Sequence, residues 1–216
     1  MSSIHHELLS TNQLAVLKKL RVFKKKAVLA GGTALSLQLA HRYSFDFDLF
    51  QDKIVSPHDL HLLNKILKIR EIVFKSSDML VVKLESDISF SLVYYWFKPL
   101  YPKIDAGYLH LFDYRDIALD KAETIGRRAT WRDYFDLFYI LQNTRFSIKD
   151  ILAGAKIKFR NEFSQEQFLT QLTYFDDLGE FDLKFVKKKY RPDEIKKFLT
   201  NEVEKFTTKL ILKQKQ

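Results

Sequence analysis

One stretch of the chain, residues 28–50, constrains the fold more than any other. It reads VLAGGTALSLQLAHRYSFDFDLF: an apolar run, a glycine pair, a helical segment and an alternation of phenylalanine with aspartate. The apolar run predicts a short buried strand from Ala27, and the glycines end it before a helix that we expect to begin at Thr33. The alternation is strand periodicity, which places Asp46 and Asp48 on one face. The stretch therefore predicts a strand, turn, helix and second strand in that order.

The turn after the first strand has two interpretations. Gly31 and Gly32 would expose backbone N–H groups at a helix N-terminus, where the missing Cβ atoms and the helix dipole favour a phosphate. The Thr33 hydroxyl would add a further donor. The alternative is a tight turn that needs glycine for its backbone angles alone, and Gly-Gly-Thr by itself favours that alternative.

The two aspartates also have two interpretations. Their Cα atoms would be about 6.6 Å apart on one strand, and neighbouring ionised carboxylates repel each other unless a cation is present. Mg²⁺ takes one or two carboxylates and completes its shell with water and nucleotide phosphates. A solvent-facing side of an edge strand explains Asp46 and Asp48 equally well. The pair alone therefore leaves the metal site and the polar surface open.

The rest of the chain divides into a mixed half and a helical half. A helix is expected from about residue 5 to residue 22, and another begins at Pro57 with Ser56 as its cap. Residues 71–97 are rich in β-branched and aromatic types, which predicts three strands in an antiparallel meander that extends the sheet. Five further helical segments are expected at residues 114–128, 130–142, 147–159, 164–175 and 191–213.

This pattern predicts an α/β domain over residues 1–112 and a helical domain over residues 113–216 packed against it, with a cleft between them. The first residues lack the layout of a signal peptide, and no apolar run is long enough for a membrane helix. The absence of cysteine excludes disulfides and thiolate metal sites. We therefore expect a cytoplasmic protein that does not associate with membranes.

The charge of the chain points to phosphate as a ligand. The formal net charge is +9, and the cations cluster within residues 18–26 and 184–191. Such clusters attract nucleic-acid backbones, although solvated helix faces carry similar runs of lysine. Tyr94, Tyr95 and Trp96 are adjacent on an expected strand, so at least one of these rings could be exposed.

The glycine pair and the D-x-D strand together are more specific than either motif alone. GGTAL followed by HRYSFDFDLF resembles the signature of the AbiEii/AbiGii-type toxin nucleotidyltransferases, a branch of the DNA polymerase β-like nucleotidyltransferase superfamily. A second block over residues 116–141 is similar to that family's D-[IL]-A-x-x-K and R-x-x-x-[KR]-D-[YF]-x-D-L patterns. The matching residues of this block are Asp116, Lys121, Arg128, Arg132, Asp133 and Asp136.

The resemblance implies an α+β fold, with a polymerase-β-like mixed sheet, flanking helices and a C-terminal helical region. It implies transfer of a nucleoside monophosphate from an NTP to an acceptor hydroxyl, with Asp46 and Asp48 as ligands of Mg²⁺ or Mn²⁺. Lys121 and Asp133 are expected as further catalytic residues, contributed by the helical domain to the cleft. The nucleotide-binding residues are expected to be Gly31, Gly32, Thr33, Arg42, Ser44 and Arg128.

The resemblance also implies a biological setting. The favoured acceptor is RNA, at the 3′ end of tRNA, and the chain is expected to be the toxin of a toxin–antitoxin or phage-defence system with a cognate antitoxin. Two alternatives stay open. The same chemistry could modify a protein or a small-molecule hydroxyl, or the chain could be a catalytically silent module that binds nucleotide or RNA.

One departure from the superfamily keeps the silent module open. Members usually carry a third carboxylate on a central strand, whereas ISFSLVYYWF offers Ser89 and Ser91 but no acid. Asp133 could replace the missing acid, or Glu85 or Asp87 in the preceding turn could reach the site. If neither does, the enzyme is weak or inactive.

Overall fold

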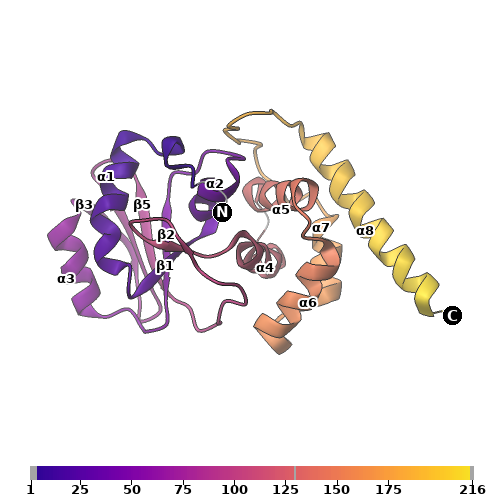
Figure 1. Cartoon of the computed structure of the whole chain (residues 1–216), viewed down its shortest axis with the longest axis horizontal. Helices are drawn as coiled ribbons and strands as arrows, with labels where there is room; N and C mark the ends of the chain where they lie inside the picture. The colour runs from indigo at the N-terminus through magenta and orange to yellow at the C-terminus, as the bar shows by residue number, and fades with distance from the viewer. Residues whose placement is uncertain (1–3, 129, 215–216) are drawn as a thin grey trace. The chain divides into compact units, whose positions relative to one another are not determined.

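The computed structural model describes residues 4–128 and 130–214, which fall into two compact units. The first unit ends at Tyr114 and the second begins at Arg115. Figure 1 shows their helices and strands. Over the described residues, no helix is both long enough and apolar enough to cross a membrane.

The first unit is built on a mixed sheet of seven strands, in the order β3-β4-β5-β2-β1-β7-β6. Strand β1 pairs antiparallel with β2 and parallel with β7, and β2 pairs parallel with β5. This arrangement confirms the expected mixed sheet. The strands are β1 Ala27–Ala30, β2 Phe47–Gln51, β3 Ile69–Lys75, β4 Met79–Leu84, β5 Ser89–Tyr94, β6 Ile104–Asp105 and β7 His110–Leu111.

The central strands lie in the core of this unit. All four residues of β1 are buried, as the apolar run predicts for a strand covered on both faces. Strand β2 alternates between buried and half-buried residues, with Phe47 and Leu49 fully enclosed. In Figure 1, β1, β2 and β5 run beside one another, with α1 and α2 flanking them. Strand β2, which carries Asp48, is therefore fixed by hydrogen bonds to β1 and β5 and by the packing of its buried side chains.

The expected meander is present as β3, β4 and β5, which pair antiparallel in sequence order. Strands β6 and β7 were not expected, because each has two residues and two residues cannot show an alternation of burial. Strand β7 nevertheless matters for the sheet, because its pairing covers the second edge of β1.

The helices of the first unit are α1 Thr11–Leu20, α2 Gly31–Leu39 and α3 Pro57–Ile66, with short 3₁₀ turns at His6–Leu8 and Arg21–Phe23. The expectation of one continuous helix from residue 5 to residue 22 was wrong. Ser10 caps α1 by accepting a hydrogen bond from the Gln13 N–H, and the Gln13 side chain accepts one from the Ser10 N–H. This capping box starts a new helix instead of continuing the preceding turn.

The second unit is helical, as expected. Thr130, Ser147 and Ser164 accept N-cap hydrogen bonds at the starts of three of its helices. Helix α4 ends at Ile125, before Gly126, so Arg128 lies outside the helix that was expected to extend over residues 114–128. The helices are α4 Tyr114–Ile125, α5 Trp131–Asn143, α6 Ile148–Phe159, α7 Gln165–Leu172 and α8 Pro192–Gln214, with a 3₁₀ turn at Arg160–Glu162.

Candidate functional site

The turn between β1 and α2 brings a glycine against the second aspartate of the D-x-D strand. Helix α2 begins at Gly31, two positions before the expected start at Thr33. Gly31 has φ of +66°, and a Cβ atom placed on it would lie 2.6 Å from Asp48 Oδ2. Only glycine tolerates both the left-handed backbone and this approach. The structure therefore joins the start of α2 directly to the Asp48 carboxylate.

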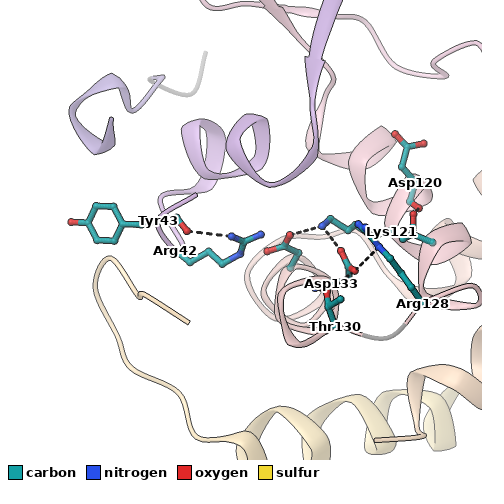
Figure 2. Close-up of polar contacts among 9 residues, drawn as sticks. Arg42, Tyr43, Asp120, Lys121, Arg128, Thr130 and Asp133 are labelled. Atoms are coloured by element: carbon teal, nitrogen blue, oxygen red, sulfur yellow. Dashed lines mark hydrogen bonds and ion pairs between the residues drawn. The ribbon is translucent and has the colours of Figure 1, made fainter. Parts of the chain in front are cut away.

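Gly32 makes a similar close approach to the segment after α2. A Cβ atom on Gly32 would lie 2.6 Å from Arg42 Nη2 and 3.0 Å from Ser44 Oγ. Arg42 is buried, and its guanidinium donates a hydrogen bond to the Tyr43 carbonyl at 3.2 Å (Figure 2). The structure thus brings Gly32, Arg42 and Ser44 together at the N-terminus of α2, where a helix favours anions.

Thr33 has a different partner from the one that the sequence suggested. It is buried, and its hydroxyl donates a hydrogen bond to the Asp46 carbonyl oxygen. The hydroxyl hydrogen therefore bonds to the backbone of the D-x-D segment, and the role of Thr33 in binding phosphate stays a prediction. This contact ties the first turn of α2 to Asp46.

Two further residues position the loop between α2 and β2. Ser36 Oγ donates to the Arg42 carbonyl at 2.7 Å, and Gln13 Nε2 donates to the Ser44 carbonyl at 2.8 Å. Gln13 reaches this loop from α1, and sequence reasoning missed both side chains. Ser36 lies within the GGTALS segment, but nothing in its spacing separates it from an ordinary helix residue.

The two aspartates occupy different local settings. Asp48 lies on β2 between Ala30 of β1 and Ser91 of β5. Ser91 Oγ donates a hydrogen bond to Asp48 Oδ1 at 2.5 Å. Asp46 comes just before the first residue of β2, and both aspartates are half-buried. Ser91 thus stands beside Asp48 on the strand where the superfamily carries its third acid, and supplies a hydroxyl in place of a carboxylate.

The donor set at this place fits a metal that is shared with a nucleotide. In the part of the chain that the structure describes, no group of three or more His, Cys, Asp or Glu side chains could hold a metal. Mg²⁺ does not need such a cage, because one or two carboxylates with waters and substrate phosphates complete its shell. Asp46 and Asp48 supply that number of carboxylates beside a helix N-terminus.

The turn acids that could have replaced the third carboxylate are engaged elsewhere. Asp87 Oδ1 accepts a hydrogen bond from Arg70 Nη1 at 2.6 Å, and Glu85 lies 3.6 Å from Lys68 Nζ. Arg70 belongs to β3, the edge strand, which is separated from β2 by β4 and β5. Both acids thus pair with exposed cations in or just before β3.

In the second unit, the motif residues of α4 and α5 form a buried ion-pair cluster. Lys121 Nζ lies 2.5 Å from Asp133 Oδ1 and 2.9 Å from Asp136 Oδ2. Thr130 Oγ1 donates to Asp133 Oδ2 at 2.7 Å, and Arg128 Nε lies 3.6 Å from the same oxygen. Figure 2 shows Lys121, Thr130 and Arg128 converging on the Asp133 carboxylate. Lys121 and Arg128 thus both lie close enough to Asp133 to form ion pairs with its carboxylate.

Two opposing effects set the pKa of Asp133. Burial alone would raise it, but the charge of Lys121 and the hydrogen bonds from Lys121 and Thr130 outweigh burial and hold the pKa below its usual range. Asp133 is therefore an ionised carboxylate at neutral pH whose charge is already balanced. It is a weak proton acceptor as long as Lys121 stays in place.

A second buried cluster involves Asp116, the first residue of the second motif block. Lys158 Nζ lies 3.0 Å from Asp116 Oδ1 and 2.6 Å from Asp120 Oδ1, and the Lys158 side chain is fully buried. Asp116 therefore links α4 to α6. Sequence reasoning missed Lys158, because AGAKIKF holds two lysines and nothing in the segment shows which of them is buried.

Comparison with known proteins gives the family and the fold. The model of the family described as "Nucleotidyl transferase AbiEii toxin, Type IV TA system" matches residues 15–89. The uncharacterized protein aq_aa25 of Aquifex aeolicus is 32% identical over 162 residues, which are 70% of this chain and 75% of that protein.

Two solved structures share the fold at low sequence identity. One, from Helicobacter pylori and described as a candidate nucleotidyltransferase, is 16% identical with a TM-score of 0.57, over 94% of this chain and 97% of that chain. The other is MenT4, a nucleotidyltransferase toxin of Mycobacterium tuberculosis, which is 14% identical with a TM-score of 0.59, over 88% of this chain and 80% of that chain.

The family match contains the first of the two motif blocks on which the resemblance was based, and the second block, residues 116–141, lies outside the matched residues. Residues 15–89 include the glycine turn, Asp46 and Asp48, and the Aquifex relative extends the similarity to most of the chain. The resemblance drawn from GGTAL and FDFDLF is thereby confirmed. The chain is an enzyme of the AbiEii nucleotidyltransferase toxin family, a family of type IV toxin–antitoxin systems.

Proposed function

We propose that this enzyme transfers a nucleoside monophosphate from an NTP to a hydroxyl of RNA, with Mg²⁺ as its cofactor and the tRNA 3′ end as its acceptor. The observation that carries the proposal is the contact between the N-terminus of α2 and the D-x-D strand. Gly31 lies against the Asp48 carboxylate, and Gly32 lies against the side chains of Arg42 and Ser44. A site that presents backbone N–H groups beside two carboxylates suits a nucleotide triphosphate bound with a divalent metal.

The first unit supplies the binding chemistry of this proposal. The triphosphate would lie at the start of α2, where the N–H groups and the helix dipole favour negative charge. The Arg42 guanidinium beside Gly32 would add positive charge. Asp46 and Asp48 would hold Mg²⁺, or Mn²⁺ in its place, which when bound polarises phosphoryl oxygens and lowers the pKa of a coordinated hydroxyl.

The reaction itself is an in-line displacement. The acceptor oxygen forms a bond to the α-phosphorus, the bond from that phosphorus to the bridging oxygen breaks, and pyrophosphate leaves. The acceptor hydroxyl must also lose its proton to a base. The resemblance assigns Asp133 to this proton and Lys121 to the triphosphate charge, and both roles stay predictions. The low pKa of Asp133 makes it a poor base unless Lys121 moves toward the substrate.

Arg128 is a second phosphate-binding candidate. Its side chain is 67% exposed although it lies near Asp133, so most of its guanidinium is available to a ligand. An exposed arginine at a partly balanced cluster can bind phosphate in two hydrogen bonds. We propose this role for Arg128, and its replacement by glutamine should raise KM for NTP more than it lowers kcat.

We further propose that the toxin is neutralised by a cognate antitoxin and acts in the cytoplasm, where NTP and tRNA are available. The family description names a type IV toxin–antitoxin system, which supports a partner of this kind. A role in phage defence follows if infection removes the antitoxin. Co-expression with the product of a neighbouring gene should restore growth if that product is the antitoxin.

Label transfer tests the proposed function. The protein is incubated with each α-³²P-labelled NTP, Mg²⁺ and total bacterial tRNA, beside the double variant Asp46→Asn/Asp48→Asn. A labelled tRNA band that the variant lacks supports the proposal and identifies the base. The matched control is Asp78→Asn/Asp176→Asn, which removes two exposed carboxylates elsewhere and should retain transfer.

Other outcomes of this assay would identify a different acceptor, or would favour a binding module over an enzyme. A labelled protein band without labelled tRNA would show that the acceptor is a protein. A labelled small molecule would show that the acceptor is a small-molecule hydroxyl. The silent RNA-binding module is favoured by one observation, the hydroxyl of Ser91 where an acid is expected. In that case no nucleotide is transferred, and Asp48→Asn retains or strengthens RNA binding because a charge that repels phosphate is removed.

A further inference from the structure

A groove in the first unit combines lysines with aromatic rings. It has a volume of about 910 Å³ and lies where β1 begins and where β2 and β5 end. Five lysines line it, against two aspartates, Asp52 and Asp59. The Asp59 carboxylate caps α3, because it accepts hydrogen bonds from the N–H and the hydroxyl of Ser56. The five lysines are Lys25, Lys26, Lys53, Lys98 and Lys103.

These lysines are available to a ligand. All five are exposed, and among the residues that the structure describes none of the five forms an ion pair with a carboxylate. Lys25 and Lys26 also line a neighbouring hollow of about 750 Å³ together with Arg21 and Lys24, so the positive surface continues past the groove. Unbalanced lysines at several points around one groove match the spaced charges of a phosphate backbone.

The aromatic rings of the groove form a supported platform. Phe50 and Tyr95 are stacked with their ring centroids 4.5 Å apart. Trp96 is held between Tyr94, at 5.9 Å, and Phe97, at 5.2 Å, yet it is 56% exposed. An exposed ring of this size that is fixed by its neighbours can accept an unstacked base on its face without a large loss of side-chain entropy.

The groove and the candidate reaction site share a strand. Phe50 lines the groove, and Asp48 precedes it by two positions on β2, so alternation places both side chains on the same face of the sheet. Two residues of a strand span about 6.6 Å, which is close to the distance between neighbouring phosphates of an extended nucleic acid strand. A chain bound in the groove could therefore continue along this face to Asp48.

We propose that this groove is a docking site for a single-stranded segment of the acceptor RNA, with phosphates on Lys25, Lys26, Lys98 and Lys103 and a base stacked on Trp96. The proposal rests on the proposed RNA acceptor and adds the place where that RNA is held. Lysine at the rim and aromatic rings within the groove suit a strand whose charge lies on its backbone and whose bases are free to stack. An acidic protein would need the lysines but not the exposed indole.

RNA binding is measured without turnover, so the test is independent of the reaction. The probe is a short fluorescein-labelled oligouridine, followed by anisotropy over about 50–200 mM salt. Trp96→Ala should weaken binding by about tenfold, whereas Trp96→Phe should retain most of the affinity. Lys25→Gln/Lys26→Gln should reduce the slope of log affinity against log salt by about 1.4, since each phosphate contact with a single strand contributes about 0.7.

Matched controls separate the groove from the general positive charge. Lys18→Gln/Lys19→Gln removes the same charge from exposed positions on α1 that do not line the groove, and Phe74→Ala removes an exposed ring from β3. Both controls should leave the affinity and the salt slope unchanged. If the control lysines matter as much as the groove lysines, binding is diffuse and the proposal is overturned.

Tryptophan fluorescence gives a direct readout of the platform. The chain has two tryptophans, and Trp131 is buried whereas Trp96 is exposed. Oligouridine should quench the native protein and should not quench Trp96→Phe, in which only Trp131 remains. Equal quenching in both proteins, or tighter binding of the corresponding DNA oligomer, would contradict an RNA site at Trp96. If the native protein binds oligouridine as expected but does not label tRNA, the proposed function is refuted and the groove remains an RNA-binding site.

Discussion

Gly31 combines two constraints that a side chain cannot meet. Its φ of +66° is strained for other residues, and a Cβ atom there would lie 2.6 Å from Asp48 Oδ2. Gly31→Ala should therefore lower the free energy of unfolding by about 1–3 kcal/mol and should reduce kcat by displacing the carboxylate. Urea denaturation and label transfer measure the two effects. Gly179→Ala is the control, because a Cβ atom there meets nothing within 4 Å, and it should change stability by less than about 0.5 kcal/mol.

Ser91 offers a way to ask whether the absent third acid limits metal binding. It already contacts Asp48 Oδ1, so in Ser91→Asp a second carboxylate would face Asp48. Without metal, we expect the variant to melt below the native protein because the two charges repel each other. With millimolar Mg²⁺, its melting temperature should rise by about 2–4 °C more than that of the native protein, since binding stabilises the folded state.

The control for this variant is Ser77→Asp, which adds the same charge to an exposed turn. Its melting temperature should respond to Mg²⁺ as the native protein does. If Ser91→Asp shows no additional response, then Asp46 and Asp48 do not form a metal site with β5.

At the scale of helices and strands, the buried lysine of α6 holds that helix to α4. Lys158 is fully buried against Asp116 and Asp120. Lys158→Met removes the cation and leaves these carboxylates in the interior, so we expect a loss of about 3–5 kcal/mol in the free energy of unfolding. Lys205→Met removes an exposed lysine that pairs with Glu202 along α8, and it should cost less than about 1 kcal/mol. Equal losses in the two variants would contradict a buried ion-pair link.

The cluster between α4 and α5 gives the protein a pH dependence at the acid end. The pKa of Asp133 is lower in the folded state than in the unfolded state, because Lys121 offsets the effect of burial. The stabilisation is therefore complete above the unfolded pKa of about 3.9 and is lost as the pH falls through the lower folded pKa. Asp133→Asn should flatten the decline in stability below about pH 4, as measured by urea midpoints across that range. An unchanged acid decline would show that Asp133 does not contribute to it.

Local signals explain which elements could be predicted from the sequence. The starts of α3, α5, α6 and α7 carry serine or threonine caps, so their positions follow from hydrogen bonds within a few residues. The glycine turn and FDFDLF were recognisable for the same reason. Strand β7 could not be found, because its two residues exist as a strand only through pairing with β1.

Contacts between residues distant in the sequence also limit how much of the site can be predicted. The sequence placed Gly31 near Asp48 only by way of the family motif, and it gave no means of pairing Ser91 with Asp48 or Lys158 with Asp116. It also gave no means of foreseeing the hydrogen bond that the Thr33 hydroxyl donates to the Asp46 carbonyl oxygen. A polar side chain can be recognised as important from its neighbours in sequence, but its hydrogen-bond partner depends on the packing of the whole unit.

For the molecule as a whole, the prediction concerns toxicity. The enzyme belongs to a toxin family, and its proposed acceptor is required for protein synthesis, so induced expression in a bacterium should stop growth. Asp46→Asn/Asp48→Asn should restore growth, because the carboxylates proposed to hold Mg²⁺ are replaced by neutral amides. The control Asp78→Asn/Asp176→Asn should stay toxic at the same soluble protein level.

The groove and the reaction site should respond differently in this assay. Trp96→Ala and Lys25→Gln/Lys26→Gln weaken RNA docking but leave both aspartates in place, so we expect partial relief of growth arrest that higher expression overcomes. The aspartate variant should stay harmless at any expression level, because added protein cannot restore an absent chemical step. Growth curves over a range of inducer concentrations separate the two behaviours. If the groove variants are as harmless as the aspartate variant at full induction, the groove residues take part in the reaction itself and not only in holding the RNA.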